Sequence, residues 1–362
     1  MDRFRVVILG TGFGRTVQAV AFARHPGFAI AAIAGADEDR ARRVARELGI
    51  PRGSADWRAL LEEEAPDLVS VATPADLHYP MVMAALERGA HVLCEKPTAL
   101  HRFQAAEMRD RAASLGRVAA IDHEFRFFPA RRHAVDLVRQ GAIGTPRHGE
   151  ILGRSAIWHR PESRGMTWLS ERARGGGILG ALGSHHTDCL RLFLGEPRAV
   201  TASLRVLQPR RGPTPERPAP GVATADDACT VHYDFAGGAT GLVDLNATVP
   251  YRWERFEIQG SEAALRWDET GYRLWRVVAG REPEEIAIPA ALGLERRPDE
   301  PALVAPFEVM LERLHRALAG REKMEPDFDD AVAVQSALDA ARAASDSGVR
   351  TAVEIPAPAV AT

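Results

Sequence analysis

The sequence predicts an α/β fold in two parts: a doubly wound parallel sheet at the N-terminus, then an α+β part with a largely antiparallel open sheet. Short apolar runs alternate with helical stretches over the first third of the chain, as in parallel sheets covered by helices on both faces. A glycine-rich turn follows the first apolar run directly. Beyond residue 124, apolar runs follow one another with glycine-rich turns between them, which is typical of antiparallel pairing.

The N-terminal part contains five predicted strands, each short and apolar. Helices are expected between them: one with apolar residues over 17–22, one with Asp37 in its first turn and Gly49 at its end, and one over 81–88. The strands are expected at 5–9, 29–34, 68–72, 91–94 and 118–121.

The C-terminal part is expected to combine three helices with six strands. Residues 209–221 carry five prolines and are expected to form a surface loop between two of these strands. The helices are expected at 130–139, 184–194 and 328–347, and the strands at 200–207, 228–235, 240–247, 254–259, 263–267 and 273–278.

The composition argues against several classes of protein. A length of 362 residues with 46% hydrophobic residues suits two globular domains with buried cores. A net charge of −3 offers no basic field for a phosphate backbone, so nucleic acid is not an expected partner. No apolar run reaches the roughly 18 residues of a membrane span. The three scattered cysteines are expected to be reduced thiols of a cytoplasmic protein, with neither disulfides nor a zinc site.

The glycine-rich turn has the pattern of a dinucleotide-binding Rossmann domain. Glycines after a strand and at a helix start permit a tight turn, and they let backbone N–H groups approach a pyrophosphate. The pattern departs from the usual one at its third glycine, where Arg15 stands and Gly14 comes one place early. The expected contacts with NAD or NADP come from Gly10, Thr11, Gly12, Phe13, Gly14 and Arg15.

A residue at the end of the second strand is expected to contact the adenosine ribose of the dinucleotide. The strand runs into Gly35, and Asp37 is the first acidic residue after it. An acidic residue here would bind the 2′-hydroxyl of NAD, whereas Arg15 and Arg40 could reach the 2′-phosphate of NADP. Asp37 is equally suited to be the N-terminal charge of the next helix. The choice between NAD and NADP therefore stays open.

Two further motifs resemble the Gfo/Idh/MocA oxidoreductases, the glucose–fructose oxidoreductase and inositol dehydrogenase family. They are Ala-Thr-Pro-Ala-Asp-Leu-His over 72–78 and Gly-Ala-His-Val-Leu-Cys-Glu-Lys-Pro over 89–97. The resemblance extends over 124–127, 141–144 and the region of His185. It implies NAD(P)-dependent oxidation or reduction of sugars, cyclitols or related polyols, and a homodimer or homotetramer. It also adds Thr73, Pro74, His78, Glu95 and Lys96 to the expected cofactor site.

Lys96 is expected to polarise the substrate oxygen. It follows the predicted strand 91–94, at the sheet edge where open α/β sheets bind ligands, and can donate a hydrogen bond to a substrate oxygen. The chain has 46 basic residues, of which only Lys96 and Lys323 are lysines, so 44 are arginines. A lysine kept in such a background suggests a role that arginine cannot fill. The alternative is an ordinary surface ammonium.

A second constellation follows the glycine-rich segment 175–183. Ser184 is expected to cap a helix on which His185 and Asp188, three residues apart, share a face. A carboxylate near an imidazole can orient it and stabilise its protonated form, as proton transfer requires. The resemblance marks both positions as catalytic or substrate-contacting. His186 would point away and is expected to be structural.

Ala181 departs from the family pattern, in which an aspartate four residues before the histidine works with the lysine. Either His185 carries the proton transfer with Lys96, or the substrate differs, or the protein does not turn over. The alternatives to a dehydrogenase are accordingly a non-catalytic dinucleotide and sugar sensor, or an NAD-dependent glycoside-cleaving enzyme of the same family.

The remaining expectations concern the substrate side. Arg126 is expected either to reach the substrate or to form a structural ion pair, and Trp158 either to stack on a sugar or to pack in the core. The pair Asp226-Asp227 lacks clustered histidine or cysteine partners, so no metal site is expected. We expect a dinucleotide-binding domain over 1–123 and a substrate-binding and oligomerisation domain over 124–362. Helix 328–347 is expected to pack back on the first domain.

Overall fold

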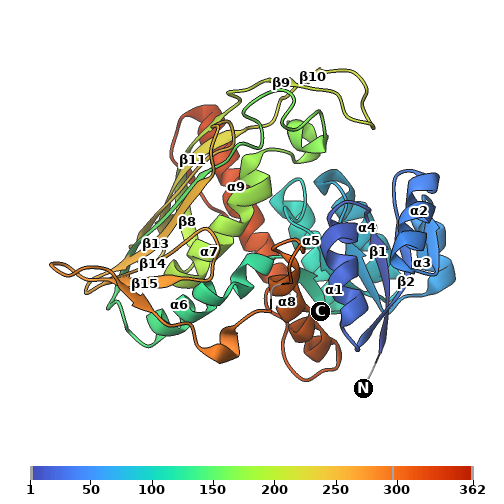
Figure 1. Ribbon diagram of the computed structural model, residues 1–362, viewed down its shortest axis with the longest axis horizontal. Helices are drawn as coiled ribbons and strands as arrows, with labels where there is room; N and C mark the ends of the chain where they lie inside the picture. The colour runs from blue at the N-terminus through green and yellow to red at the C-terminus, as the bar shows by residue number, and fades with distance from the viewer. Residues whose placement is uncertain (1–2, 296, 360–362) are drawn as a thin grey trace. The chain divides into compact units, whose positions relative to one another are not determined.

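The computed structural model describes residues 3–295 and 297–359, which form two compact units (Figure 1). The first unit comprises Met1–Phe127, Glu295–Val332 and Pro356–Thr362, and the second comprises Phe128–Leu294 and Ala333–Ile355. The chain therefore does not divide once near residue 123, as the sequence suggested. It leaves the first unit after Phe127 and returns to it twice.

The first unit is built on a parallel sheet of six strands in the order β3-β2-β1-β4-β5-β6. The four-residue core of β1, from Val6 to Leu9, is fully buried, because a parallel sheet is covered on both faces. The strand β3, which is short and lies at the edge of the sheet, was not predicted. The strands are β1 (Phe4–Leu9), β2 (Phe28–Ala34), β3 (Arg52–Ser54), β4 (Leu68–Val71), β5 (His91–Cys94) and β6 (Ala119–Ile121).

Helices cover both faces of this sheet. On one face, apolar residues of α1, α2 and α8 pack against alternate residues of β1, and on the other those of α3, α4, α5 and the start of α9. The predicted doubly wound parallel sheet is confirmed. The helices α3, α5 and α8 were not expected. The bounds are α1 (Ala19–Arg24), α2 (Glu38–Leu48), α3 (Trp57–Glu64), α4 (His78–Glu87), α5 (Arg102–Ser114), α8 (Val304–Leu318) and α9 (Phe328–Ser347).

The second unit is built on a mixed sheet of nine strands in the order β16-β15-β14-β13-β7-β12-β11-β8-β17. All neighbours are antiparallel except β7 and β12, which are parallel. The strands are β7 (Pro146–Arg154), β8 (Pro197–Arg205), β11 (Ala228–Phe235), β12 (Thr240–Asn246), β13 (Trp253–Gly260), β14 (Ala264–Trp267), β15 (Leu274–Val277), β16 (Glu284–Ile286) and β17 (Thr351–Ala352).

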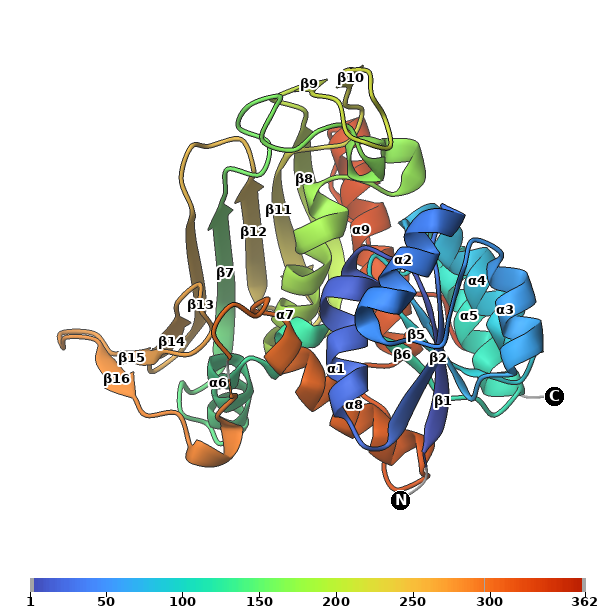
Figure 2. The same ribbon diagram turned by 45° about the vertical axis from the view of Figure 1, so that its right-hand side comes forward.

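One face of this sheet carries the helices of the second unit. Figure 2 shows α6 (Pro129–Arg139), α7 (Ser184–Leu194) and the later part of α9 against it. Inward residues of β11, such as Val231 and Tyr233, are buried there, whereas His232 on the opposite face is exposed. The expected proline-rich loop contains a two-residue strand pair, β9 (Arg210–Arg211) with β10 (Gly221–Val222).

Candidate active site

The glycine-rich turn joins β1 to a helix that begins with one π-helical turn over Gly14–Gln18 and continues as α1. Gly10 has φ +131° and approaches β4 so closely that a Cβ atom would lie 2.1 Å from the Ala72 carbonyl oxygen. Gly12 faces open space, since a Cβ there would meet no atom within 4 Å. This combination of close strand contact and an open helix start fits the pyrophosphate of a dinucleotide.

The segment that follows β2 lies at the same edge of the sheet as the glycine-rich turn. The Oδ1 atom of Asp37 accepts a hydrogen bond from the Arg40 backbone N–H at 2.8 Å, so Asp37 caps α2. Gly35 packs on Thr11, and Arg15 forms an ion pair with Glu47 of α2 at 2.9 Å. The structure thus gives both Asp37 and Arg15 partners within the protein.

His78 connects the turns that follow β4 and β5. Its ring is buried, with Nδ1 3.0 Å from the carbonyl oxygen of Pro97 and Nε2 2.8 Å from that of Thr73. Burial lowers the pKa of His78. His78 therefore holds the Thr73-Pro74 turn against the loop that carries Lys96. Lys96 itself is half-buried and lies two residues after the end of β5.

A buried carboxyl cluster that was not predicted lies beside Lys96. It consists of Glu95, which follows β5, and of Asp122 and Glu124, which follow β6; all three are at least 94% buried, with exposed fractions of 6%, 0% and 1%. Gln18 donates from Nε2 to Glu95 Oε1 and to Asp122 Oδ2, both at 3.1 Å. The carboxyl ends of neighbouring parallel strands meet at one edge, which brings these groups together.

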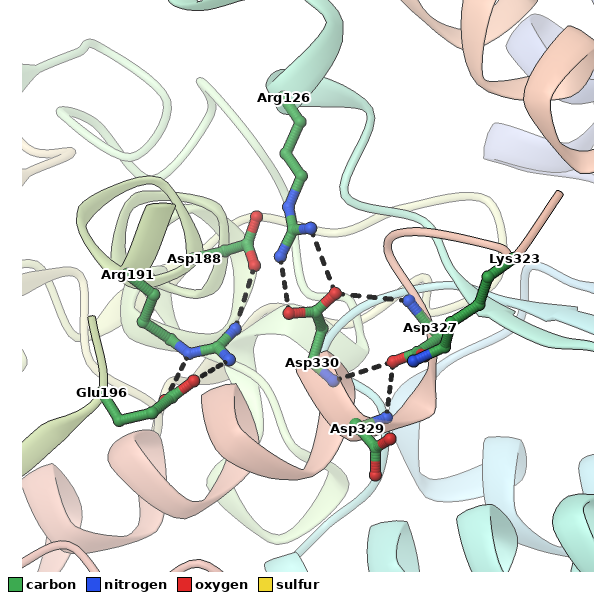
Figure 3. A network of polar contacts seen from close by, with 8 residues as sticks. All are labelled: Arg126, Asp188, Arg191, Glu196, Lys323, Asp327, Asp329 and Asp330. Carbon is green, nitrogen blue, oxygen red and sulfur yellow. Dashed lines mark hydrogen bonds and ion pairs between the residues drawn. The ribbon is translucent and has the colours of Figure 1, made fainter. Parts of the chain in front are cut away.

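Arg126 forms a structural ion pair in the first unit. Figure 3 shows its guanidinium facing Asp330, with Nη1–Oδ2 and Nη2–Oδ1 distances of 3.0 and 2.9 Å. Asp327 caps α9 by accepting from the backbone N–H groups of Asp329 and Asp330, and it pairs with Lys323 at 3.1 Å. Of the two roles expected for Arg126, the structure shows the ion pair.

In the second unit, the helix that carries His185 begins earlier than predicted. A π-helical segment over Leu179–Gly183 runs directly into α7, so Ser184 lies within the helix and its hydroxyl donates to the Gly180 carbonyl at 2.7 Å. The expected cap at Ser184 is therefore wrong. Asp226, which lies 47 residues after Leu179 in the chain, caps the helix instead. Its Oδ2 accepts a hydrogen bond from the backbone N–H of Leu179 at 2.8 Å.

Both residues of α7 that are expected to act on substrate are buried. His185 and Asp188 are 2% and 1% exposed. Figure 3 shows Arg191 between Asp188 and Glu196: its Nη1 lies 3.4 Å from Asp188 Oδ1, and its Nε donates to Glu196 at 2.8 Å. Arg191 was not expected, and it holds the carboxylate of Asp188 from the next turn. Burial lowers the pKa of His186 to about 3, consistent with a neutral structural histidine.

Trp158 belongs to the hydrophobic core of the second unit, with 1% of its surface exposed. The guanidinium of Arg211 lies 5.2 Å from its ring centroid, and Arg211 pairs with buried Asp227 at 3.1 Å. Of the two roles expected for Trp158, the structure shows core packing. Asp227 also accepts from the backbone of Leu207 and Gln208, so it anchors the loop before β9.

Over 3–295 and 297–359, no group of three or more histidine, cysteine, aspartate or glutamate residues is arranged to hold a metal ion. No helix in these ranges is long and apolar enough to cross a membrane. The three cysteines are free thiols in the interior.

Two family models match the chain. Residues 4–123 match one described as "Oxidoreductase family, NAD-binding Rossmann fold", and residues 131–266 match the GFO/IDH/MocA C-terminal domain. D-apiose dehydrogenase of Paraburkholderia graminis is 30% identical over 76% of this chain and 70% of its own length. Levoglucosan dehydrogenase of Pseudarthrobacter phenanthrenivorans is 29% identical over 73% of each chain.

Solved structures of similar proteins have the same fold. An oxidoreductase domain protein from Kribbella flavida superposes with a TM-score of 0.87 at 28% identity, covering 98% of this chain and 100% of that one. A levoglucosan dehydrogenase in complex with NADH gives 0.87 at 25% identity with the same coverage. The family resemblance and the nicotinamide cofactor expected from the sequence are confirmed. The chain belongs to the Gfo/Idh/MocA family of NAD-binding oxidoreductases.

Proposed function

We propose that this oxidoreductase transfers a hydride between a nicotinamide dinucleotide and a hydroxyl- or carbonyl-bearing carbon of a sugar, cyclitol or related polyol. The main support is the position of Lys96. It follows β5 in the same parallel sheet whose β1 carries the open glycine turn, and both lie at the carboxyl edge where such sheets bind ligands. The named relatives act on levoglucosan and apiose, which are carbohydrates.

Different residues of this chain would perform different steps of alcohol oxidation. The dinucleotide, when bound, supplies the hydride acceptor or donor. Lys96 donates a hydrogen bond to the substrate oxygen and stabilises the negative charge that develops there. His185 moves the hydroxyl proton, and Asp188 orients its imidazole. Arg191, by pairing with Asp188, keeps that carboxylate in one place.

Ala181 supports a second candidate. It lies in the π-helical segment before α7, four residues ahead of His185, so a methyl group occupies the position where the family resemblance expects a carboxylate. A protein with dinucleotide and sugar sites that lacks this group could act as a sensor. Reduction of the dinucleotide by any sugar or polyol would exclude that candidate. Release of a free sugar without net change in the dinucleotide would instead indicate glycoside cleavage.

We further propose that the protein works as a homodimer or homotetramer in the cytoplasm. The sheet face opposite the helices of the second unit carries ordered ion pairs, such as Arg154 with Asp244 and Arg266 with Glu257. A face of this kind suits a polar interface. Three buried free thiols suit a reducing compartment. Light scattering with size-exclusion chromatography would test the assembly: a monomer at micromolar concentration would contradict it.

The first experiment is a titration of the cofactor-stripped protein with NADH and then NADPH, followed by nicotinamide fluorescence. Preference for one of them by at least about tenfold, or about 1.4 kcal/mol, would identify the cofactor for a substrate screen. The screen would then offer sugars and cyclitols with the matching oxidised dinucleotide. Failure to bind either dinucleotide would refute the proposed function.

A further inference from the structure

The carboxyl cluster of Glu95, Asp122 and Glu124 is joined by direct contacts between acids. The carboxyl groups of Glu95 and Asp122 lie close enough to share a proton, and so do those of Asp122 and Glu124. An ionised carboxylate only accepts hydrogen bonds, so each acid–acid contact needs one proton. One shared proton in each of the two contacts would leave a single negative charge on the cluster.

Gln18 is oriented to support this arrangement. The hydroxyl of Ser70 donates to Gln18 Oε1 at 2.8 Å, which directs the amide nitrogen toward the acids. Both N–H groups of that nitrogen are then used, one on Glu95 and one on Asp122. The other Asp122 oxygen, Oδ1, is buried and receives no hydrogen bond within the described part of the chain. A buried oxygen without a donor favours the protonated form of its carboxyl group.

The electrostatics of the surrounding groups agree with bound protons. Burial and the Asp122 charge raise the pKa of Glu95 well above its usual range, and burial and the Glu124 charge do the same for Asp122. Burial and the Glu95 charge raise the pKa of Glu124 to about 8. The charge of Lys96 opposes the shifts of Glu95 and Glu124, so its ammonium lies within electrostatic reach of both.

The neighbouring thiol of Cys94 adds no charge to the cluster. Burial raises the pKa of Cys94 well above its ordinary value, which keeps this thiol neutral. His123 lies between Asp122 and Glu124 in the chain and is also buried. The cluster lies at the carboxyl ends of β5 and β6, within electrostatic reach of Lys96. A charge that binds at this edge can therefore change the number of protons that the cluster holds.

We propose that Glu95, Asp122 and Glu124 form a proton-sharing unit that releases one proton when a positively charged nicotinamide ring binds and takes it back when the ring is neutral. The proposal rests on the dinucleotide site of the proposed function. An oxidised nicotinamide ring carries a positive charge that the reduced ring lacks. Binding of the oxidised form shifts the unit from two protons and one negative charge to one proton and two negative charges, and the released proton passes to the buffer.

The consequence is a pH-dependent preference between the two redox forms. Because release of a proton accompanies binding of the oxidised dinucleotide only, its affinity rises with pH by up to about tenfold per pH unit, whereas that of the reduced form does not. Asp122 and Glu124 act here through Glu95 and Lys96, so they are positioning residues.

Infrared spectroscopy of the dinucleotide-free protein tests the bound protons without any activity. We expect a carbonyl stretching band of protonated carboxylic acids at pH 7 that disappears at alkaline pH, and that weakens in Asp122→Asn and Glu124→Gln. Glu257→Gln is the matched control. Glu257 is also buried, but hydrogen bonds from Arg266 and Gln259 outweigh burial and lower its pKa, so its removal leaves the band unchanged. Absence of the band in the unmodified protein would overturn the proposal.

Calorimetry tests the coupling. The oxidised and the reduced dinucleotide are each titrated into the protein in two buffers of different ionisation enthalpy, which gives the number of protons released. We expect up to about one proton for the oxidised form, none for the reduced form, and a smaller difference in Asp122→Asn and Glu124→Gln. Equal release for both forms would refute the coupling. If neither dinucleotide binds, the proposed function fails and the coupling with it, while the infrared band still decides whether protons are shared.

Discussion

Replacing Glu124 with glutamine is expected to stabilise the protein increasingly as the pH rises. In the folded protein the pKa of Glu124 is raised from 4.5 to about 8, first by burial and then by the charge of Glu95. Between these pH values the native protein holds a proton that the unfolded chain has released. The stability that this group contributes is therefore complete below about pH 4.5 and is lost as the pH rises to about 8.

The size of the effect follows from the same two values. Each pH unit corresponds to about 1.4 kcal/mol for one proton, and the interval spans about 3.5 units, so the full loss is about 5 kcal/mol. Glutamine is neutral at every pH and nearly isosteric with protonated glutamate. The variant should thus match the unmodified protein near pH 4.5 and exceed its stability by about 3–5 kcal/mol at pH 8.

Urea unfolding followed by circular dichroism at half-unit steps from pH 5 to pH 8.5 would measure this. Glu257→Gln serves as the control with the opposite sign: the pKa of Glu257 is lowered by its hydrogen bonds with Arg266 and Gln259, in spite of burial. That contribution is present above the ordinary pKa and is lost as the pH falls, so this variant should lose stability at neutral pH. A constant difference between Glu124→Gln and the unmodified protein across the range would show that Glu124 binds no proton at neutral pH.

Three further predictions concern the site and its supports. Lys96→Ala should lower turnover by orders of magnitude with dinucleotide affinity nearly intact, while Lys323→Ala, at a side chain that is 74% exposed, should change neither; unchanged kinetics in the first variant would remove the lysine from the mechanism. Gly12→Ala should leave the melting temperature unchanged but weaken dinucleotide binding at least about tenfold. Gly14→Ala should instead lower the free energy of unfolding by about 1–3 kcal/mol, because the added Cβ would lie 2.9 Å from a β1 side chain. The reverse pattern would contradict the assigned turn. Asp226→Ala removes the acceptor from the first turn of the His185 helix and should cost about 1–3 kcal/mol, and an unaltered melting temperature would show that the cap is dispensable.

The parallel sheet and its ligand-binding edge could be predicted because their signals are local. An apolar run, a glycine turn and the Glu95-Lys96-Pro97 sequence each lie within a few residues of chain. The strand β7 gave no such signal, although it lies in the middle of the second sheet. Two of its inward positions are glycines, and a Cβ at Gly149 or Gly153 would lie 2.5 or 2.7 Å from a leucine side chain. Close packing thus required small residues where apolar alternation would have revealed a strand.

The carboxyl cluster and the cap of the His185 helix depend on contacts between distant parts of the chain. Gln18 and Asp122 are 104 residues apart, and Asp226 and Leu179 are 47 apart. The expected cap at Ser184 followed the usual preference for serine at helix starts. It was wrong because the helix begins five residues earlier, where a carboxylate from another segment supplies the acceptor.

The first unit is assembled from three separate stretches, and this affects how the protein can emerge from the ribosome. Phe22 and Phe28 on one face of the six-stranded sheet are covered by α8, whose Phe307 lies 6.1 Å from Phe22 between ring centroids. After residue 127 about 190 more residues must be made before α8 is complete, which takes about 10–40 s at about 5–20 residues per second. During that time this face of the first sheet lacks its cover by α8, while strands β7 to β16 of the second unit are synthesised. The nascent chain is therefore a natural substrate for chaperones that bind apolar surface.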